Sequence, residues 1–350
     1  MAESVIGAAG LVAIVAVHGA RRLLDATGSG PWPVRVVEVV SAVVVATAAL
    51  ETAWASWRLG YERRWGFARQ TAGAWLLDRL KGLAISLIFA NGLALGFYAL
   101  VRSTPAWWLV AWAAAVGWSV AMATLAPTLL APLFNRFRPL DDAWLAGRAV
   151  ELGRQVGVRI RQVLVMDASR RTSKHNAYFT GLGRTKRVVL WDTLLADVPP
   201  SAALAVVAHE LSHWRRRHGH RMLAVGAAVL LVAFGVLRLA LDSPAIGIWA
   251  GFRGPADPAA APLALLVLVA LEALTLPVSL WLSRAWERQA DADAVAWSGD
   301  PDAMLGMHRE LALKNLSDLA PSGLAYLLSS HPPPAERLAL AAAMGAAMGP

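Results

Sequence analysis

Residues 206–241 read VVAHELSHWRRRHGHRMLAVGAAVLLVAFGVLRLAL, so a segment rich in histidine and arginine runs directly into a long apolar stretch. The apolar part has the length of about 17 to 25 residues at which a helix spans a bilayer. His209 and His213 are four residues apart, so on a helix they project from one face and both imidazoles can reach one ion. The sequence therefore predicts a metal-binding helix that leads into a membrane span.

The composition of the whole chain is that of a membrane protein. Of 350 residues, 57% are hydrophobic, only 16% are charged and 16 are tryptophan, and a soluble domain carries a larger charged fraction. Apolar stretches near or above the spanning length lie at residues 4–20, 36–57, 83–101, 106–126, 222–241 and 262–283. For the first stretch a signal peptide is the alternative, but its start, MAES, has no positive charge. We therefore expect six spans.

The net charge of +9 would also suit a protein that binds nucleic acid. The arginines, however, cluster in short loops beside apolar stretches, without a nucleic-acid motif or an aromatic stacking surface, so no nucleic-acid partner is expected. Six Lys and Arg residues lie between the second and third stretches, against three in the loop before. By the positive-inside rule this favours an N-terminus and a C-terminus that both face the cytoplasm.

Any metal must be held by histidine and carboxylate side chains, because the chain has no cysteine. Glu210 follows the first histidine and is placed to take a proton from metal-bound water. The segment SRAWERQADADAVAW, residues 283–297, offers Glu287 as a third ligand and Asp291, one helical turn later, as a hydrogen-bond partner of a ligand imidazole. A solvated helix with charges at i and i+4 is the alternative. The position of the segment directly after a span favours the metal site.

The residues outside the spans form two polar blocks. We expect four spans in residues 1–135, a block with a small sheet and the HExxH helix in 136–220, two spans in 221–283, and a block with the third ligand in 284–350. The fold class expected is therefore a multi-pass α-helical membrane protein with a small α+β domain at the membrane face.

Within the first polar block, two β-branched runs predict strands, RIRQVLVMDAS at 159–169 and KRVVLWDTLL at 186–195. Pro199, Pro200 and Ser201 predict the start of the HExxH helix, with Ser201 as a possible cap. His218 and His220 follow the motif, and we interpret them as part of a basic helix end at the membrane surface.

Six segments of the chain resemble the type I CAAX prenyl proteases, which are integral-membrane zinc metallopeptidases of the gluzincin kind. They occur in the same order and extend from about residue 60 to 340: ERRWGFARQTAGAWLLDRLKG (62–82), APLFNRFRPLDD (131–142), HNAYFTGLGRTKRVVLWDTLL (175–195), HELSHW (209–214), SRAWERQADADA (283–294) and SSHPPPAERL (329–338). Ser212 departs from the pattern, because the family commonly has glycine there, but a small residue is kept.

The resemblance implies roles for residues that composition and spacing do not identify. Asn176 matches an asparagine that contacts the substrate backbone. His331 and Arg337 match residues that face the scissile bond, the histidine as a group that stabilises the oxyanion. We expect a substrate to bind as an added strand beside residues 186–195.

The sequence thus predicts an endopeptidase embedded in the lipid bilayer, with one Zn²⁺ per chain held by His209, His213 and Glu287. Glu210 and His331 are the expected catalytic residues. Its substrates would be membrane-associated or C-terminal, CAAX-like peptides, including prenylated or misfolded membrane proteins. A bacterial inner membrane, with the site toward the cytoplasm, is the expected location. The alternative is a transporter or receptor-like protein whose zinc is structural.

Overall fold

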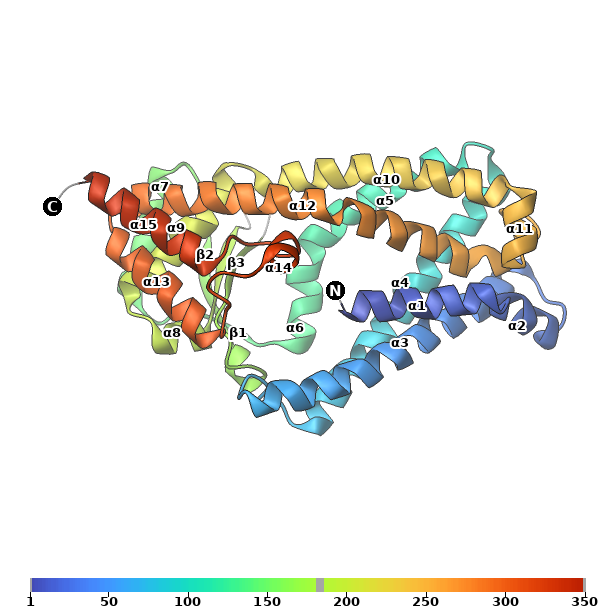
Figure 1. Cartoon of the computed structure of the whole chain (residues 1–350), viewed down its shortest axis with the longest axis horizontal. Helices are drawn as coiled ribbons and strands as arrows, with labels where there is room; N and C mark the ends of the chain where they lie inside the picture. Colours follow the sequence, from blue (N-terminus) through green and yellow to red (C-terminus); the bar gives the residue numbers. More distant parts are fainter. Residues whose placement is uncertain (1, 181–185, 349–350) are drawn as a thin grey trace. The chain divides into compact units, whose positions relative to one another are not determined.

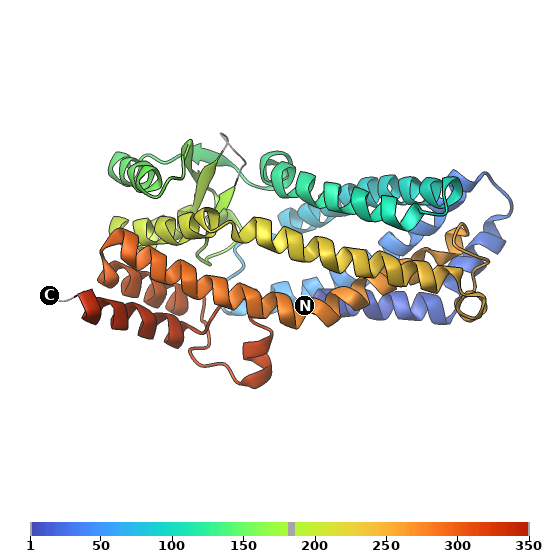
Figure 2. The same ribbon diagram turned by 90° about the horizontal axis from the view of Figure 1, so that it is seen from above.

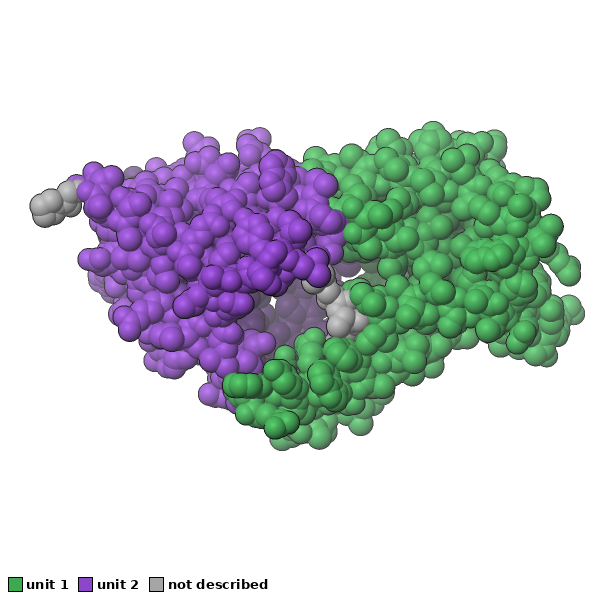
Figure 3. All heavy atoms as spheres, in the orientation of Figure 1, with its two compact units in different colours: residues 1–65, 71–119, 224–275 green, residues 66–70, 120–223, 276–350 purple. Residues whose placement is uncertain are grey.

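The structure is a computed structural model that describes residues 2–180 and 186–348. The chain divides into two units, coloured green and purple in Figure 3, and the first comprises residues 1–65, 71–119 and 224–275. The second comprises residues 66–70, 120–223 and 276–350. Three helices contribute residues to both units: α5 (Trp107–Leu125), α10 (His218–Asp242) and α12 (Ala261–Ser298).

The first unit consists of helices and their connections, with no strand in its described residues (Figure 1). Besides its parts of α5, α10 and α12, it contains α1 (Ala2–Ala16), α2 (Gly19–Thr27), α3 (Trp32–Arg64), α4 (Ala72–Ser103) and α11 (Pro244–Ala250). Its core is a cluster of buried aliphatic and aromatic side chains that includes Val36, Tyr98 and Leu237. In each of the five candidate spans, however, 22% or less of the most apolar stretch is buried within the protein, as expected for helices in lipid.

Five described helical segments are long and apolar enough to cross a membrane, and, apart from residue 106, they contain the predicted stretches 36–57, 83–101, 106–126, 222–241 and 262–283. The third of them continues from α5 through a π-helical turn into α6 (Ala131–Phe134). Helix α12 has 38 residues, about 57 Å at 1.5 Å per residue, so it is longer than a hydrocarbon core of about 30 Å.

The first predicted span, residues 4–20, is not one continuous helix. Helices α1 and α2 are bent by 59° at a break that could make a broken span or a re-entrant loop. The break lies at His18, which has a left-handed backbone with φ of 51°, and its Nε2 atom lies 2.9 Å from the carbonyl oxygen of Trp249. A non-glycine residue rarely adopts this conformation, so tertiary contacts decide it.

The second unit contains a four-stranded mixed sheet. The strands are β1 (Phe137–Pro139), β2 (Gln162–Met166), β3 (Ala177–Thr180) and β4 (Arg187–Trp191), in the order β1-β2-β4-β3. Strands β2 and β4 are parallel, and the other pairs are antiparallel. The prediction of strands in 159–169 and 186–195 is confirmed for β2 and β4, but residues 192–197 form helix α8 (Asp192–Asp197), and β1 and β3 were not predicted.

The position of β4 contradicts the prediction that a substrate adds a strand beside residues 186–195. Strand β4 pairs with β2 on one side and with β3 on the other. Within residues 2–180 and 186–348, no strand pairs with the outer edge of β3. An extended peptide can therefore join this sheet beside β3 but not beside β4.

Helix α9 (Pro200–Arg215) lies between the sheet and a layer formed by the end of α12, α13 (Pro301–Lys314) and α15 (Pro334–Met348) (Figures 1 and 2). It is buried almost all round, because small residues at its start allow close packing against α7 (Ala143–Gln155), β3 and α13. Pro199 stands at its N-cap position, so Ser201 is not the cap. The helix that carries HExxH is thus the centre of the core of the second unit.

Candidate metal centre and active site

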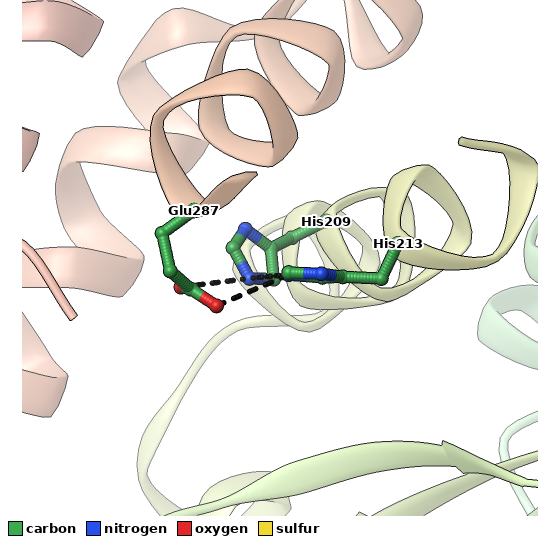
Figure 4. Close-up of side chains that lie close together, drawn as sticks. All are labelled: His209, His213 and Glu287. Atoms are coloured by element: carbon green, nitrogen blue, oxygen red, sulfur yellow. Dashed lines mark hydrogen bonds and ion pairs between the residues drawn. The ribbon is translucent and has the colours of Figure 1, made fainter. Parts of the chain in front are cut away.

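The two histidines of the motif and Glu287 meet at one point between α9 and α12. The Nε2 atoms of His209 and His213 are 3.2 Å apart. Glu287 places Oε2 3.4 Å from Nε2 of His209 and Oε1 3.2 Å from Nε2 of His213. Figure 4 shows the three side chains pointing toward one another, and their ligand atoms all lie within 4.8 Å of one another.

These donor atoms fit a metal ion. Two nitrogen atoms that share a tetrahedral Zn²⁺ at about 2.0 to 2.1 Å are separated by about 3.3 Å, close to the 3.2 Å observed here. Burial disfavours charge on His209, but hydrogen bonds to Asp291 and Glu287 outweigh it and raise the pKa of His209 to about 10. The two buried carboxylates therefore favour positive charge at this point, which a bound cation would supply in place of the proton on His209.

Asp291 holds the far side of the His209 ring. Its Oδ1 atom lies 2.9 Å from Nδ1 of His209. Arg337 donates two hydrogen bonds to Asp291, at 2.7 and 2.5 Å, and Nε2 of the buried His308 lies 3.4 Å from Asp291. This chain of contacts orients the imidazole so that Nε2 faces Glu287 and His213.

Arg337 was expected to bind substrate, and in the structure its guanidinium group contacts the carboxylates of Asp291 and Glu287. Only 14% of its side chain is exposed, its Nε and Nη2 atoms donate to Asp291, and Nη2 lies a further 3.4 Å from Oε2 of Glu287. A buried bidentate ion pair of this kind fixes carboxylate geometry. This ion pair gives Arg337 a positioning role, and because Arg337 also lines the cavity beside the candidate metal ligands, its contact with a substrate stays a prediction.

Glu210, Asn176 and His331 line one cavity of about 450 Å³. Burial raises the pKa of Glu210, against the opposing effect of the neighbouring histidines, and its carboxylate accepts a hydrogen bond from the backbone N–H of Phe179. The side chain of His331 is 58% exposed, and its Nδ1 atom lies 2.8 Å from Oε2 of Glu287. All three side chains thus lie at the same opening as the candidate metal ligands.

Asn176 is positioned by a contact that the sequence did not reveal. The preceding residue, His175, is buried and donates its backbone N–H to Oδ1 of Asn315, 3.1 Å away. The Asn315 amide in turn donates to the carbonyl oxygen of His175 at 3.4 Å. This pair of hydrogen bonds joins the start of β3 to the end of α13, and so places the exposed Asn176 at the rim of the cavity.

The interpretation of His218 as part of a basic helix end at the membrane surface is wrong. His218 is 3% exposed, and its Nδ1 atom lies 3.1 Å from Nδ1 of His213. The reason is the reversal between α9 and α10, where Arg217 has a left-handed φ of 58° and turns the first residue of α10 back onto the metal-bearing helix. His220 is exposed, in agreement with the sequence-based interpretation.

Membrane-crossing helices together with a His–His–Glu set and an adjacent glutamate define a membrane metallopeptidase. The chain belongs to peptidase family M48, whose profile matches residues 139–344. The profile "CAAX prenyl protease N-terminal, five membrane helices" matches residues 2–136. The protein is therefore an integral multi-pass membrane metallopeptidase that uses a metal cofactor and acts on peptide or protein substrates. The transporter or receptor-like alternative is not favoured.

Individual proteins agree with the family assignment. The chain is 30% identical to "Uncharacterized metalloprotease YhfN" of Bacillus subtilis, over 85% of this chain and 71% of that protein. It is 32% identical to "CAAX prenyl protease 1 homolog" of Arabidopsis thaliana, over 79% of this chain and 66% of that protein. The crystal structure of S. mikatae Ste24p superposes with a TM-score of 0.81 and 25% identity, covering 89% of this chain and 77% of that one.

Proposed function

We propose that the chain is a zinc endopeptidase in which His209, His213 and Glu287 hold the metal and Glu210 is the general base. The observation that carries the proposal is the convergence of these three donors beside a cavity that Glu210 also lines. When bound, zinc supplies a Lewis acid for the scissile carbonyl and lowers the pKa of a water molecule. Three ligands from the protein leave a fourth position for that chemistry.

Glu210 takes the proton of the attacking water on its carboxylate and delivers it to the leaving amine nitrogen. Its burial supports this role, because the raised pKa of a buried carboxyl makes it a stronger proton acceptor. The backbone N–H of Phe179 holds the carboxylate against β3, on the side where a peptide would lie if it paired with that strand.

His331 and Asn176 act on the substrate. In our proposal His331 donates a hydrogen bond to the oxygen of the scissile carbonyl as negative charge develops there. Its contact with Glu287 at 2.8 Å keeps the imidazole beside the candidate metal ligands. Asn176, at the rim of the cavity, binds the backbone of a peptide that lies along the outer edge of β3.

The substrate class we propose is the C-terminal or membrane-associated peptide, including CAAX-like and prenylated ends and misfolded membrane proteins. Two observations support it: relatives named as CAAX prenyl proteases, and the direct continuation of both metal-bearing segments into candidate spans, α10 after α9 and α12 around Glu287. A peptide that is itself attached to a membrane would reach such a site without leaving the bilayer.

Substituting the candidate zinc ligands and the candidate general base one at a time distinguishes a zinc peptidase from a protein whose zinc is structural. Each of His209→Ala, His213→Ala and Glu287→Ala should lose most bound zinc and all hydrolysis. Glu210→Gln should keep zinc and an unchanged melting temperature, while hydrolysis falls by a factor of about 10² to 10⁴. Zinc content by mass spectrometry and cleavage of a prenylated and an unprenylated peptide are the measurements.

The outcome that overturns the proposal is a parent protein that holds zinc and cleaves neither peptide, with Glu210→Gln causing no change. The substrate class has its own test. Membrane-protein fragments are compared between cells that carry the parent protein and cells that carry Glu210→Gln. Fragments that depend on Glu210 and come only from soluble proteins would contradict the membrane-associated class while leaving the peptidase proposal intact.

A further inference from the structure

His218 faces the rear of one candidate metal ligand. The Nε2 atom of His213 points to His209 and Glu287, and its Nδ1 atom points to Nδ1 of His218 at 3.1 Å. The Nδ1 atom of His213 therefore contacts a second imidazole, whereas the Nδ1 atom of His209 contacts the carboxylate of Asp291.

The metal-facing atom of His213 determines the direction of this hydrogen bond. A histidine that offers the lone pair of Nε2 to a metal carries its hydrogen on Nδ1. That N–H must find an acceptor, since an unpaired donor in a buried site costs free energy. Nδ1 of His218 lies at hydrogen-bond distance and accepts when His218 carries its own hydrogen on Nε2, for which the side chain of Gln289 is the acceptor.

The His218 ring is fixed by its packing. It is 3% exposed and stacks on Trp286, with ring centroids 5.1 Å apart and an interplanar angle of 8°. It meets the His213 ring edge-on, also at 5.1 Å. Trp286 directly precedes Glu287 on α12, so one stack connects the start of α10, the second ligand of α9 and the helix of the third ligand.

We propose that His218 is a positioning residue that sets the tautomer and ring orientation of His213, and so contributes to metal affinity. The proposal rests on the metal site assigned above. Partners behind metal-bound histidines orient the ring and raise ligand basicity, and their loss typically lowers affinity by about 10 to 100-fold. Because the partner here is a neutral imidazole, its hydrogen bond can be removed without removing a charge.

The test measures zinc affinity of the full-length protein in detergent by competition with a chelator of known affinity. His218→Phe keeps a ring on Trp286 but removes the acceptor, and affinity should fall by about 10 to 100-fold. His218→Gln keeps an acceptor oxygen and should remain within a few-fold of the parent. His220→Gln is the matched control, since His220 is exposed on the same helical turn, and it should bind zinc as the parent does.

Two further measurements separate positioning from packing. The melting temperature in excess chelator should be the same for His218→Phe and the parent, because the ring stack is kept. The electronic spectrum of the Co²⁺-substituted protein should change in His218→Phe and return toward the parent in His218→Gln. If His218→Phe does not fold, His218→Met replaces it, because Met matches Gln in shape and lacks the oxygen acceptor.

A zinc affinity equal to that of the parent in His218→Phe or His218→Met would overturn the proposal. A loss of zinc affinity in His218→Gln as large as that in His218→Phe would also overturn it, because the loss would then come from the missing imidazole ring and not from the missing acceptor. A parent protein without zinc affinity would instead overturn the metal site itself. The parent measurement therefore distinguishes the failure of the site from the failure of the role of His218.

Discussion

At the scale of single residues, His331 and Asn176 line the cavity but are not among the three candidate metal ligands. Substituting them therefore tests the role of the site toward substrate without removing a metal ligand. We predict that His331→Ala lowers kcat by a factor of about 10² to 10³, the effect of removing one oxyanion donor. Zinc content should stay near one per chain. Single-turnover kinetics with metal analysis is the measurement, His220→Ala is the control, and zinc loss in His331→Ala would contradict the assigned role.

For Asn176→Ala we predict a higher KM with zinc content unchanged, because its amide is assigned to the peptide backbone and not to the metal. Asn315→Ala should reproduce part of this effect from a distance, since Asn315 holds the main chain of His175. A parental KM in both variants would remove Asn176 from the substrate site.

At the scale of elements, the contact between α9 and α12 decides whether the ligands of the two helices meet. Ser212 is fully buried and donates to Oδ2 of Asp293 at 2.6 Å. Arg216, at the end of α9, donates two hydrogen bonds to the same carboxylate at 2.5 and 2.8 Å. The hydroxyl that this chain has in place of the family's common glycine therefore joins the two metal-bearing helices.

We predict that Ser212→Ala lowers the free energy of unfolding by about 1.5 kcal/mol, the lower end for a hydrogen bond to a charged group. The cost should be smaller by at least about 0.5 kcal/mol when Asp293 is already alanine, because the partners are in direct contact. Thermal and denaturant unfolding measure both. Ser201→Ala, exposed on the same helix and not a cap, is the control. Additive effects would contradict the contact.

A second element depends on one buried arginine of α12. Arg284 is 2% exposed and donates from Nη1 to the carbonyl oxygens of Tyr326, Leu327 and Ser329 at 3.3, 3.1 and 2.7 Å. These carbonyls end the short helix α14 (Gly323–Leu327) and lead into the segment with His331. Arg284 thus ties the His331 segment to the helix of Glu287.

We predict that Arg284→Gln exposes residues 316–333 to limited proteolysis and lowers kcat, because three part-buried carbonyl oxygens lose their donor and His331 loses its support. Zinc content should change little. Arg309→Gln, an exposed substitution on α13, is the control. An unchanged proteolysis pattern in Arg284→Gln would show that the segment is held by other contacts.

At the scale of the whole molecule, the site restricts the membrane topology. The candidate metal ligands come from α9 and from the part of α12 around Glu287, and two candidate spans, α10 and the first part of α12, separate them along the chain. Two crossings return the chain to the side from which it left. We therefore predict that, with both candidate spans crossing the bilayer, the polar segments before α10 and after α12 share one side of the membrane.

We predict that this shared side is the cytoplasm of a bacterial cell, because Lys and Arg are concentrated in the loop after the second predicted span. Reporter fusions after residues 145 and 345 should both report inside. A fusion after residue 255, between α11 and α12, should report outside and serves as the control. A periplasmic signal at 145 and 345 would reverse the orientation, whereas opposite signals at these two positions would contradict the two-crossing path.

Sequence alone determined what depends on local periodicity and on the solvent. Five spans could be predicted because a bilayer imposes a length and an apolar composition on any helix that crosses it. His209 and His213 could be paired because four residues make about one helical turn. Glu287 and Asp291 could be placed on one face of a second helix for the same reason.

Only the tertiary structure decided the contacts between residues that no local pattern connects. Arg337 bonds Asp291 across 46 residues, His18 breaks the first apolar stretch at a contact 231 residues away, and β3 becomes an edge strand through pairing with β4. His218 returns to His213 through one left-handed residue, Arg217. Local secondary-structure propensity does not predict these long-range contacts, because they are stabilised by burial and hydrogen bonds that form only when the chain is folded.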